Sequence, residues 1–262
     1  MTAGAPAIGP TPRMATAAPP AGAALVERGT IRHDEVRVRR WEVRGIAKVV
    51  RQVEVGVGSL AGTVVIGGAL TAEELQVVGS LEARGPVQVA GRFVARGSVD
   101  VRSTTHAGEA ELAGPIRCAG ELGVDRTLRV RGALQAPSLR GGGLEIRGSA
   151  TIPGNVVAES FDAHLVGDSA IGSVQCRTFR LRGPVPGLVP RLLGPEAVVT
   201  VERVDAERAW VEGARVGLVR AGEITLGRAA RVTAIEGKLV RAHPSSRVGP
   251  SSWSRPPPGL SR

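Results

Sequence analysis

Residues 79–102 contain four consecutive hexads, and their pattern is the feature that most constrains the fold. They read GSLEAR, GPVQVA, GRFVAR and GSVDVR, so each begins with glycine and carries apolar residues at its third and fifth positions. Such alternation predicts a short strand with one buried face, and a glycine at every sixth residue predicts a bend between strands. Because a strand of this length buries little surface alone, it must stack on copies of itself. The pattern therefore predicts a β-solenoid.

The inward-facing pairs extend well beyond the hexads, from Val36/Val38 to Phe179/Leu181. The gap between successive pairs is usually four residues, but at intervals it shrinks to three, and these short gaps recur at one or two multiples of about 17 residues. They follow Val38, Val55, Ala72, Ala107, Gly141, Ala158 and Cys176. We therefore expect an all-β, triangular parallel solenoid whose turns contain six, six and five residues.

The first inward residue after each short gap defines one column of the solenoid. Its large members are Trp41, Leu75, Phe93, Leu128, Leu144, Phe161 and Phe179, which include all three phenylalanines of the chain. Equivalent positions of a solenoid lie directly above one another, so these side chains should form an internal ladder. We interpret the column as structural core and not as a ligand site.

Changes in composition and spacing divide the chain into five segments. Residues 1–28 are rich in proline and alanine and are expected to form a disordered tail, followed by the main β-helix at 29–182. Residues 183–197 contain four prolines and are expected to form a joint outside the sheet. Inward residues then recur every five positions, which predicts a second, narrower coil at 198–241, and residues 242–262 are expected to be a disordered tail. Whether the second coil stacks on the first stays open at this point.

The net charge of +10 and the sequence pI near 11.3 would suit a polyanionic partner. Arginines, however, alternate with carboxylates at outward positions, which favours a mixed solvated face and no specific nucleic acid. One local basic cluster comprises Arg37, Arg39, Arg40 and Arg44, near the first turn. We expect it to protect an open end of the solenoid from edge pairing, with contact to anionic lipid as the alternative.

The residue types used for catalysis and metal binding are scattered. The histidines show no metal-ligand spacing with Cys, Asp or Glu; they are His33, His106, His164 and His243. Cys118 and Cys176 occupy inward positions, which indicates small buried hydrophobes in a reducing compartment. We therefore predict no catalytic, cofactor-binding or metal site, no enzymatic activity and no cofactor. No apolar run has the length of a membrane-spanning helix, and a cytoplasmic location is expected.

Hexads such as GSLEAR–GPVQVA and GSVDVR, with V-x-G or V-x-V strands, resemble those of the bactofilins, or polymer-forming cytoskeletal proteins. Residues 201–237 are similar to the C-terminal part of a bactofilin-like branch, and the resemblance covers roughly residues 29–241. It implies a right-handed β-helix that polymerises end to end without nucleotide. It also implies scaffold filaments for cell shape or morphogenesis, at the inner face of a bacterial membrane, with peripheral membrane or scaffolded proteins as partners.

Self-assembly also follows from the physics of a solenoid, whose two ends carry unpaired backbone groups that must be capped or paired. Two alternatives remain. A trimeric hexapeptide-repeat acyltransferase usually has a small residue first in each pair and turns of about 18 residues, whereas this chain has pairs such as Phe93/Ala95. A monomeric β-helical binding protein at the cell surface would need an export signal, which the first 28 residues do not show.

Overall fold

The computed structural model describes residues 24–184 and 198–249, and this part of the chain is built from strands without a helix. All fourteen strands belong to one parallel sheet. They are β1 (Ala24–His33), β2 (Val36–Val49), β3 (Val53–Ile66), β4 (Leu70–Ala83), β5 (Val87–Val101), β6 (Thr105–Cys118), β7 (Leu122–Val124), β8 (Thr127–Gln135), β9 (Leu139–Leu165), β10 (Ser169–Arg182), β11 (Val199–Glu212), β12 (Arg215–Leu226), β13 (Arg231–Ala242) and β14 (Arg247–Val248).

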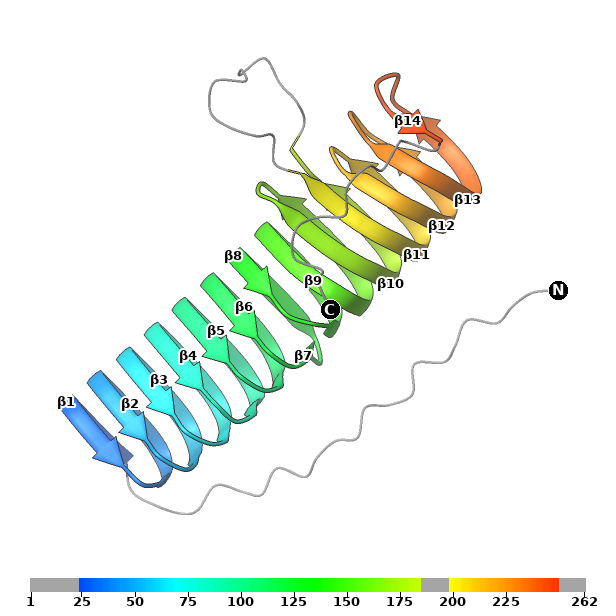
Figure 1. The fold of residues 1–262 in the computed structure, drawn as a ribbon. Helices are drawn as coiled ribbons and strands as arrows, with labels where there is room; N and C mark the ends of the chain where they lie inside the picture. Colours follow the sequence, from blue (N-terminus) through cyan, green and yellow to red (C-terminus); the bar gives the residue numbers. More distant parts are fainter. Residues whose placement is uncertain (1–23, 185–197, 250–262) are drawn as a thin grey trace, which may run out of the picture.

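The sheet is wound into a parallel β-solenoid of about 12 turns with 17-residue rungs, which confirms the predicted fold class and repeat. Val36 pairs with Val53, and Val53 pairs with Leu70, so each residue lies beside its equivalent in the next turn. Figure 1 shows these turns stacked in chain order, from β1 in blue to β14 in red. Residues that are further along the sequence therefore lie further along the axis of the solenoid.

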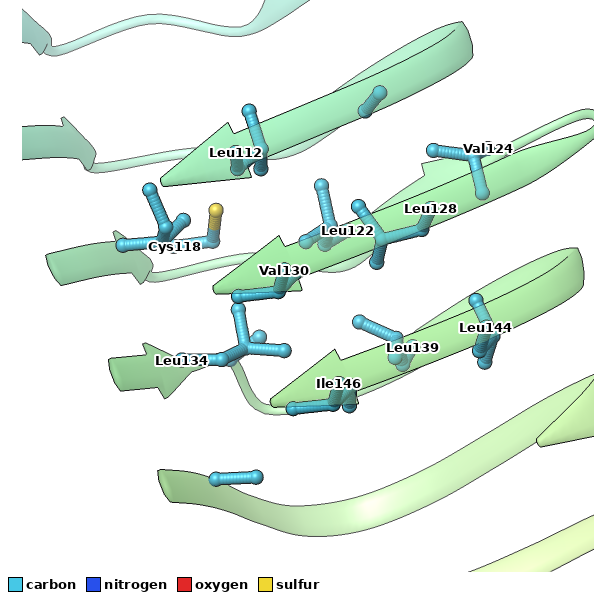
Figure 2. Packing of buried hydrophobic residues seen from close by; sticks show 14 of the residues in the cluster. Leu112, Cys118, Leu122, Val124, Leu128, Val130, Leu134, Leu139, Leu144 and Ile146 are labelled. Carbon is cyan, nitrogen blue, oxygen red and sulfur yellow. The ribbon is translucent and has the colours of Figure 1, made fainter. Parts of the chain in front are cut away.

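Each turn carries three inward-facing pairs, which lie on continuous strands that bend at the corners. In β3 these pairs are Val53/Val55, Gly58/Leu60 and Val64/Ile66, all within one strand of 14 residues. Sequence alternation predicts separate short strands instead, because it marks the corners but cannot show that backbone pairing continues around them. Figure 2 shows the resulting interior, where Leu112, Val130 and Ile146 lie one above another in successive turns.

One corner of the turn can be built only from glycine. Gly62 has a φ of +122°, and a Cβ added there would lie 2.0 Å from the carbonyl oxygen of Gly45 in the turn below. L-residues with a side chain rarely adopt this φ, and the neighbouring backbone leaves no room for one. A positive φ recurs along a glycine column, and for every member except the first an added Cβ would meet the backbone of the preceding turn; the members are Gly29, Gly45, Gly62, Gly79, Gly97, Gly114, Gly132 and Gly148.

The stack begins earlier and ends later than the sequence predicts. Residues 24–28, expected to belong to a tail, form the start of β1, which pairs with β2 over its whole length. At the other end, β14 adds a further pairing to β13 beyond residue 242. The expected disorder of residues 1–23 and 250–262 lies outside the described residues.

The two predicted coils form one stack. β10 pairs directly with β11, with Ser169 beside Val199, although the chain between them contains the expected proline-rich joint. The Arg182 guanidinium carbon lies 5.2 Å from the centroid of the Trp210 ring across this seam. Beyond the seam, Val201 pairs with residue 216 and Val216 with residue 232, so the turns contain 15 or 16 residues. Residues 185–197 of the joint lie outside the described residues.

Candidate functional sites at the two ends of the solenoid

The predicted core column lies inside the solenoid. Its seven large members are each at most 2% exposed. They are in register step by step from Trp41 through Gly58, Leu75, Phe93, Ala110 and Leu128 to Leu144, and again from Phe161 to Phe179. The Phe161 and Phe179 rings are stacked, with their centroids 5.4 Å apart and their planes 5° apart. Because its large members are buried and lie in register from turn to turn, the column is part of the structural core.

The predicted basic cluster is not at the end of the stack, which corrects its expected role. Arg37, Arg39, Arg40 and Arg44 all lie on β2. β1 covers this strand, and Arg28 of β1 pairs in register with Arg44. Arg44 forms an ion pair with Glu42 at 3.0 Å, and Arg37 forms one with Glu35. These arginines therefore do not guard an open edge, because β1 supplies a turn that the alternation pattern did not reveal.

The N-terminal end turn carries two polar residues at inward positions. Glu27 is in register with Val43, and His33 is in register with Val49, so both stand above core columns. The Nε2 atom of His33 lies 2.7 Å from Oε1 of Glu27. The indole Nε1–H of Trp41 donates to the Oε2 atom of Glu27 at 3.0 Å. This polar pair closes one side of the core and satisfies the buried indole, and inward charge at an edge strand opposes indiscriminate pairing.

The C-terminal end turn presents apolar residues that no further turn covers in the described part of the chain. Leu239 of β13 continues the core column after Ala209 and Ile224, which are buried. Leu239 itself is 44% exposed, and Val240 and Val248 beside this end are also exposed. The edge of the sheet and an unfinished apolar core therefore coincide here, which is the arrangement expected of an association surface.

Both cysteines are free and buried, as their inward positions predict. Cys118 is in register with Val101, and Cys176 is in register with Ala206, so the two thiols belong to different columns and different turns. Burial raises the pKa of the Cys118 thiol and raises the pKa of Cys176 to about 12. A thiol whose pKa is raised carries less thiolate at neutral pH, which is the reactive form.

We expect neither cysteine to react with Ellman's reagent in the folded protein at pH 8 over several hours, because burial excludes the reagent and disfavours the thiolate. In guanidinium chloride both should react within minutes. A Val166→Cys variant is the matched control, because Val166 is 63% exposed and its thiol should react at once in the folded protein. Rapid native-state modification of Cys118 or Cys176 would show that the core opens locally.

The remaining candidate groups form no cluster. His106 Nε2 lies 3.3 Å from Oδ1 of Asp125 on the outer surface. In residues 24–184 and 198–249, no group of three or more His, Cys, Asp or Glu side chains is placed to hold a metal ion. The same ranges contain no helix with the length and apolar character needed to cross a membrane.

The structure brings together a second set of arginines that the sequence analysis did not identify. Arg215 of β12 pairs in register with Arg231 of β13, which pairs with Arg247 of β14. We call these three residues the arginine column. The sequence indicates this column through an Arg-Val dipeptide that occurs at 215–216, 231–232 and 247–248. The three arginines come into register only if the turns in this part of the chain contain 16 residues and not 17.

Comparisons with protein-family models, with curated proteins and with solved structures found no match for this chain. The geometry of the two ends of the solenoid therefore carries the functional argument.

Proposed function

We propose that this protein is a structural protein that self-assembles end to end, without nucleotide, into scaffold filaments. The observation that carries the proposal is the 44% exposure of Leu239, a core-column residue at the edge of the stack. The hexad pattern supports it independently, because it resembles that of the bactofilins. On the same resemblance we propose a cytoplasmic filament at the inner face of a membrane that serves cell shape or morphogenesis.

The physical basis is that the ladder of the solenoid is open at β1 and at β13–β14 in the described residues. A second copy can continue the backbone pairing and cover Leu239, so one contact satisfies both the sheet edge and the unfinished core. Such contacts generate filaments when they are heterologous, or when two different isologous joints alternate. No step of this assembly requires nucleotide binding.

Leu239→Lys should abolish filaments or raise the concentration needed for assembly at least about tenfold, because an unpaired ammonium would be buried in the joint. The wild-type chain should form filaments without nucleotide in negative-stain electron micrographs and sediment as large species. The variant should sediment as small species with unchanged far-UV circular dichroism, because Leu239 is partly exposed within one copy.

Val166→Lys is the matched control, since Val166 follows β9 on the side of the solenoid and is 63% exposed. It introduces the same charge away from the ends and should assemble like the wild type. A wild-type chain that stays monomeric at all concentrations would refute the proposal. Uniform trimers would instead favour the acyltransferase alternative, with acyl-CoA assays as the next measurement.

A further inference from the structure

The polar pair Glu27–His33 of the N-terminal end turn stands on two core columns that are apolar in the turns that follow. The next members of these columns are each at most 4% exposed; they are Val43, Leu60, Val77, Ala95 and Leu112 after Glu27, and Val49, Ile66, Ala83, Val101 and Cys118 after His33. Among these turns, only the end turn places side chains that carry charge near neutral pH at the two inward positions.

The pair is held together and is largely shielded from water. The Glu27 side chain is 13% exposed and the His33 side chain 28%. One oxygen of Glu27 lies 2.7 Å from Nε2 of His33, and the other accepts the indole N–H of Trp41 at 3.0 Å. Acceptance through both oxygens is the role of an ionised carboxylate. An imidazole changes charge between about pH 5 and 8, so proton uptake changes the net charge of the pair from −1 to zero.

No other charged side chain of the described residues faces the pair. β2 is the strand that pairs with β1, and its residues beneath the pair are Trp41, Val43 and Val49. Asp34 and Glu35 follow His33, and each forms an ion pair with an arginine. The charged residues of the two strands are exposed or lie at outward positions; they are Arg28, Arg32, Arg37, Arg39, Arg40, Glu42, Arg44 and Lys48. The charge of the buried end is thus set within the pair itself.

We propose that a second copy stacks on β1 with uptake of a proton by the Glu27–His33 pair, so that mild acid strengthens assembly at the N-terminal end. This inference rests on the proposed end-to-end assembly. β1 offers the second copy a sheet edge of ten residues, and its Leu25 is in register with Trp41 of the core column. A copy stacked there would remove the remaining exposed part of both polar side chains from water.

The direction of the pH dependence follows from the cost of burying charge. A hydrogen-bonded ion pair with no net charge is less costly to bury than a carboxylate beside a neutral imidazole. At a pH where the imidazole of the free end is already charged, joint formation should not depend on pH. At higher pH each joint must take up a proton, so the assembly concentration should rise by up to about tenfold per pH unit until the imidazole is neutral in the joint as well.

The test is sedimentation of the full chain at several concentrations between about pH 6 and pH 9 at constant ionic strength, above the range in which carboxyl groups usually titrate. The wild-type chain should assemble at an at least about tenfold lower concentration at pH 6 than at pH 9. His33→Gln keeps a donor for Glu27 without a titratable charge, so its profile should be flat. Glu27→Gln should invert the profile, because a protonated imidazole would then be buried without a counter-charge. A purely structural role of the pair would not invert the sign.

Two further histidine variants are the controls. His106 Nε2 also lies near a carboxylate, 3.3 Å from Oδ1 of Asp125, but its side chain is 47% exposed on the side of the solenoid. His243 follows β13 at the other end, where its Nδ1 atom lies 2.8 Å from Oγ of Ser245. His106→Gln and His243→Gln should both keep the wild-type profile.

A flat wild-type profile would overturn this inference and leave end-to-end assembly standing. So would a slope that survives in His33→Gln or disappears in His243→Gln, or a Glu27→Gln profile with the wild-type sign. Failure of the wild-type chain to assemble at every pH would overturn both this inference and the proposed function. Far-UV circular dichroism should be the same for all variants, because each substitution lies at the end or on the surface of the stack.

Discussion

Gly97→Ala should lower the free energy of unfolding by about 3 kcal/mol or more, because glycine is required there for two separate reasons. Gly97 has a φ of +131°, and an added Cβ would lie 1.9 Å from the carbonyl oxygen of Gly79. That oxygen belongs to the backbone of the preceding turn, and Gly79 is itself packed against Gly62. Relief of the clash would therefore require several turns to shift.

Denaturant titration followed by circular dichroism measures this effect as a shift of the midpoint. Gly143→Ala is the matched control, because its φ lies outside the left-handed region and the nearest atom to its Cβ would be Ser160 Oγ at 3.5 Å. An alanine at a compatible site changes stability by only about 0.4–1 kcal/mol, and in the stabilising direction. Equal midpoints for the two variants would show that the glycine corner can relax.

Phe179→Ala should cost about 3–5 kcal/mol, because it leaves a cavity in the core column. The Phe179 ring is 1% exposed and stacks on Phe161, with the ring centroids 5.4 Å apart. The turns above and below are held by the sheet ladder, so they cannot collapse far enough to fill the space. The double variant with Phe161→Ala should cost less than the sum of the single variants, since the two rings share one contact.

The measurement is again the midpoint of chemical denaturation, compared with Val166→Ala, which removes apolar atoms from an exposed position. That control should change stability by no more than about 0.5 kcal/mol. A Phe179→Ala variant as stable as the control would mean that the column tolerates a void, contrary to close packing.

The interior could be predicted because a solenoid repeats one environment in every turn. Phe161 and Phe179 are 18 residues apart in the sequence and directly stacked in the structure, so spacing alone identified the contact. It was harder to predict which glycines of the hexads adopt a positive φ. Gly79 and Gly85 look alike in the hexads, yet of these two only Gly79 has a positive φ.

The ends were predicted poorly because they depart from the repeat. Glu27 and His33 occupy inward positions, so the alternation that identified later turns is absent from the first one. For this reason Arg37–Arg44 were expected at the end of the stack and lie instead beneath β1. The arginine column was missed for a different reason, namely that the residues per turn fall from 17 to 15 or 16 after the joint. End-to-end assembly itself stays a prediction.

The stacking of each turn only on its neighbours has a mechanical consequence. Backbone hydrogen bonds run along the axis, so a force that pulls the chain from one end loads a single turn at a time. Each turn that detaches would release about 55–60 Å of extended chain, because an extended residue spans about 3.3–3.6 Å and a rung contains 17 residues. The molecule would therefore lengthen in nearly equal steps under tension, and the shorter turns beyond the seam would give shorter steps.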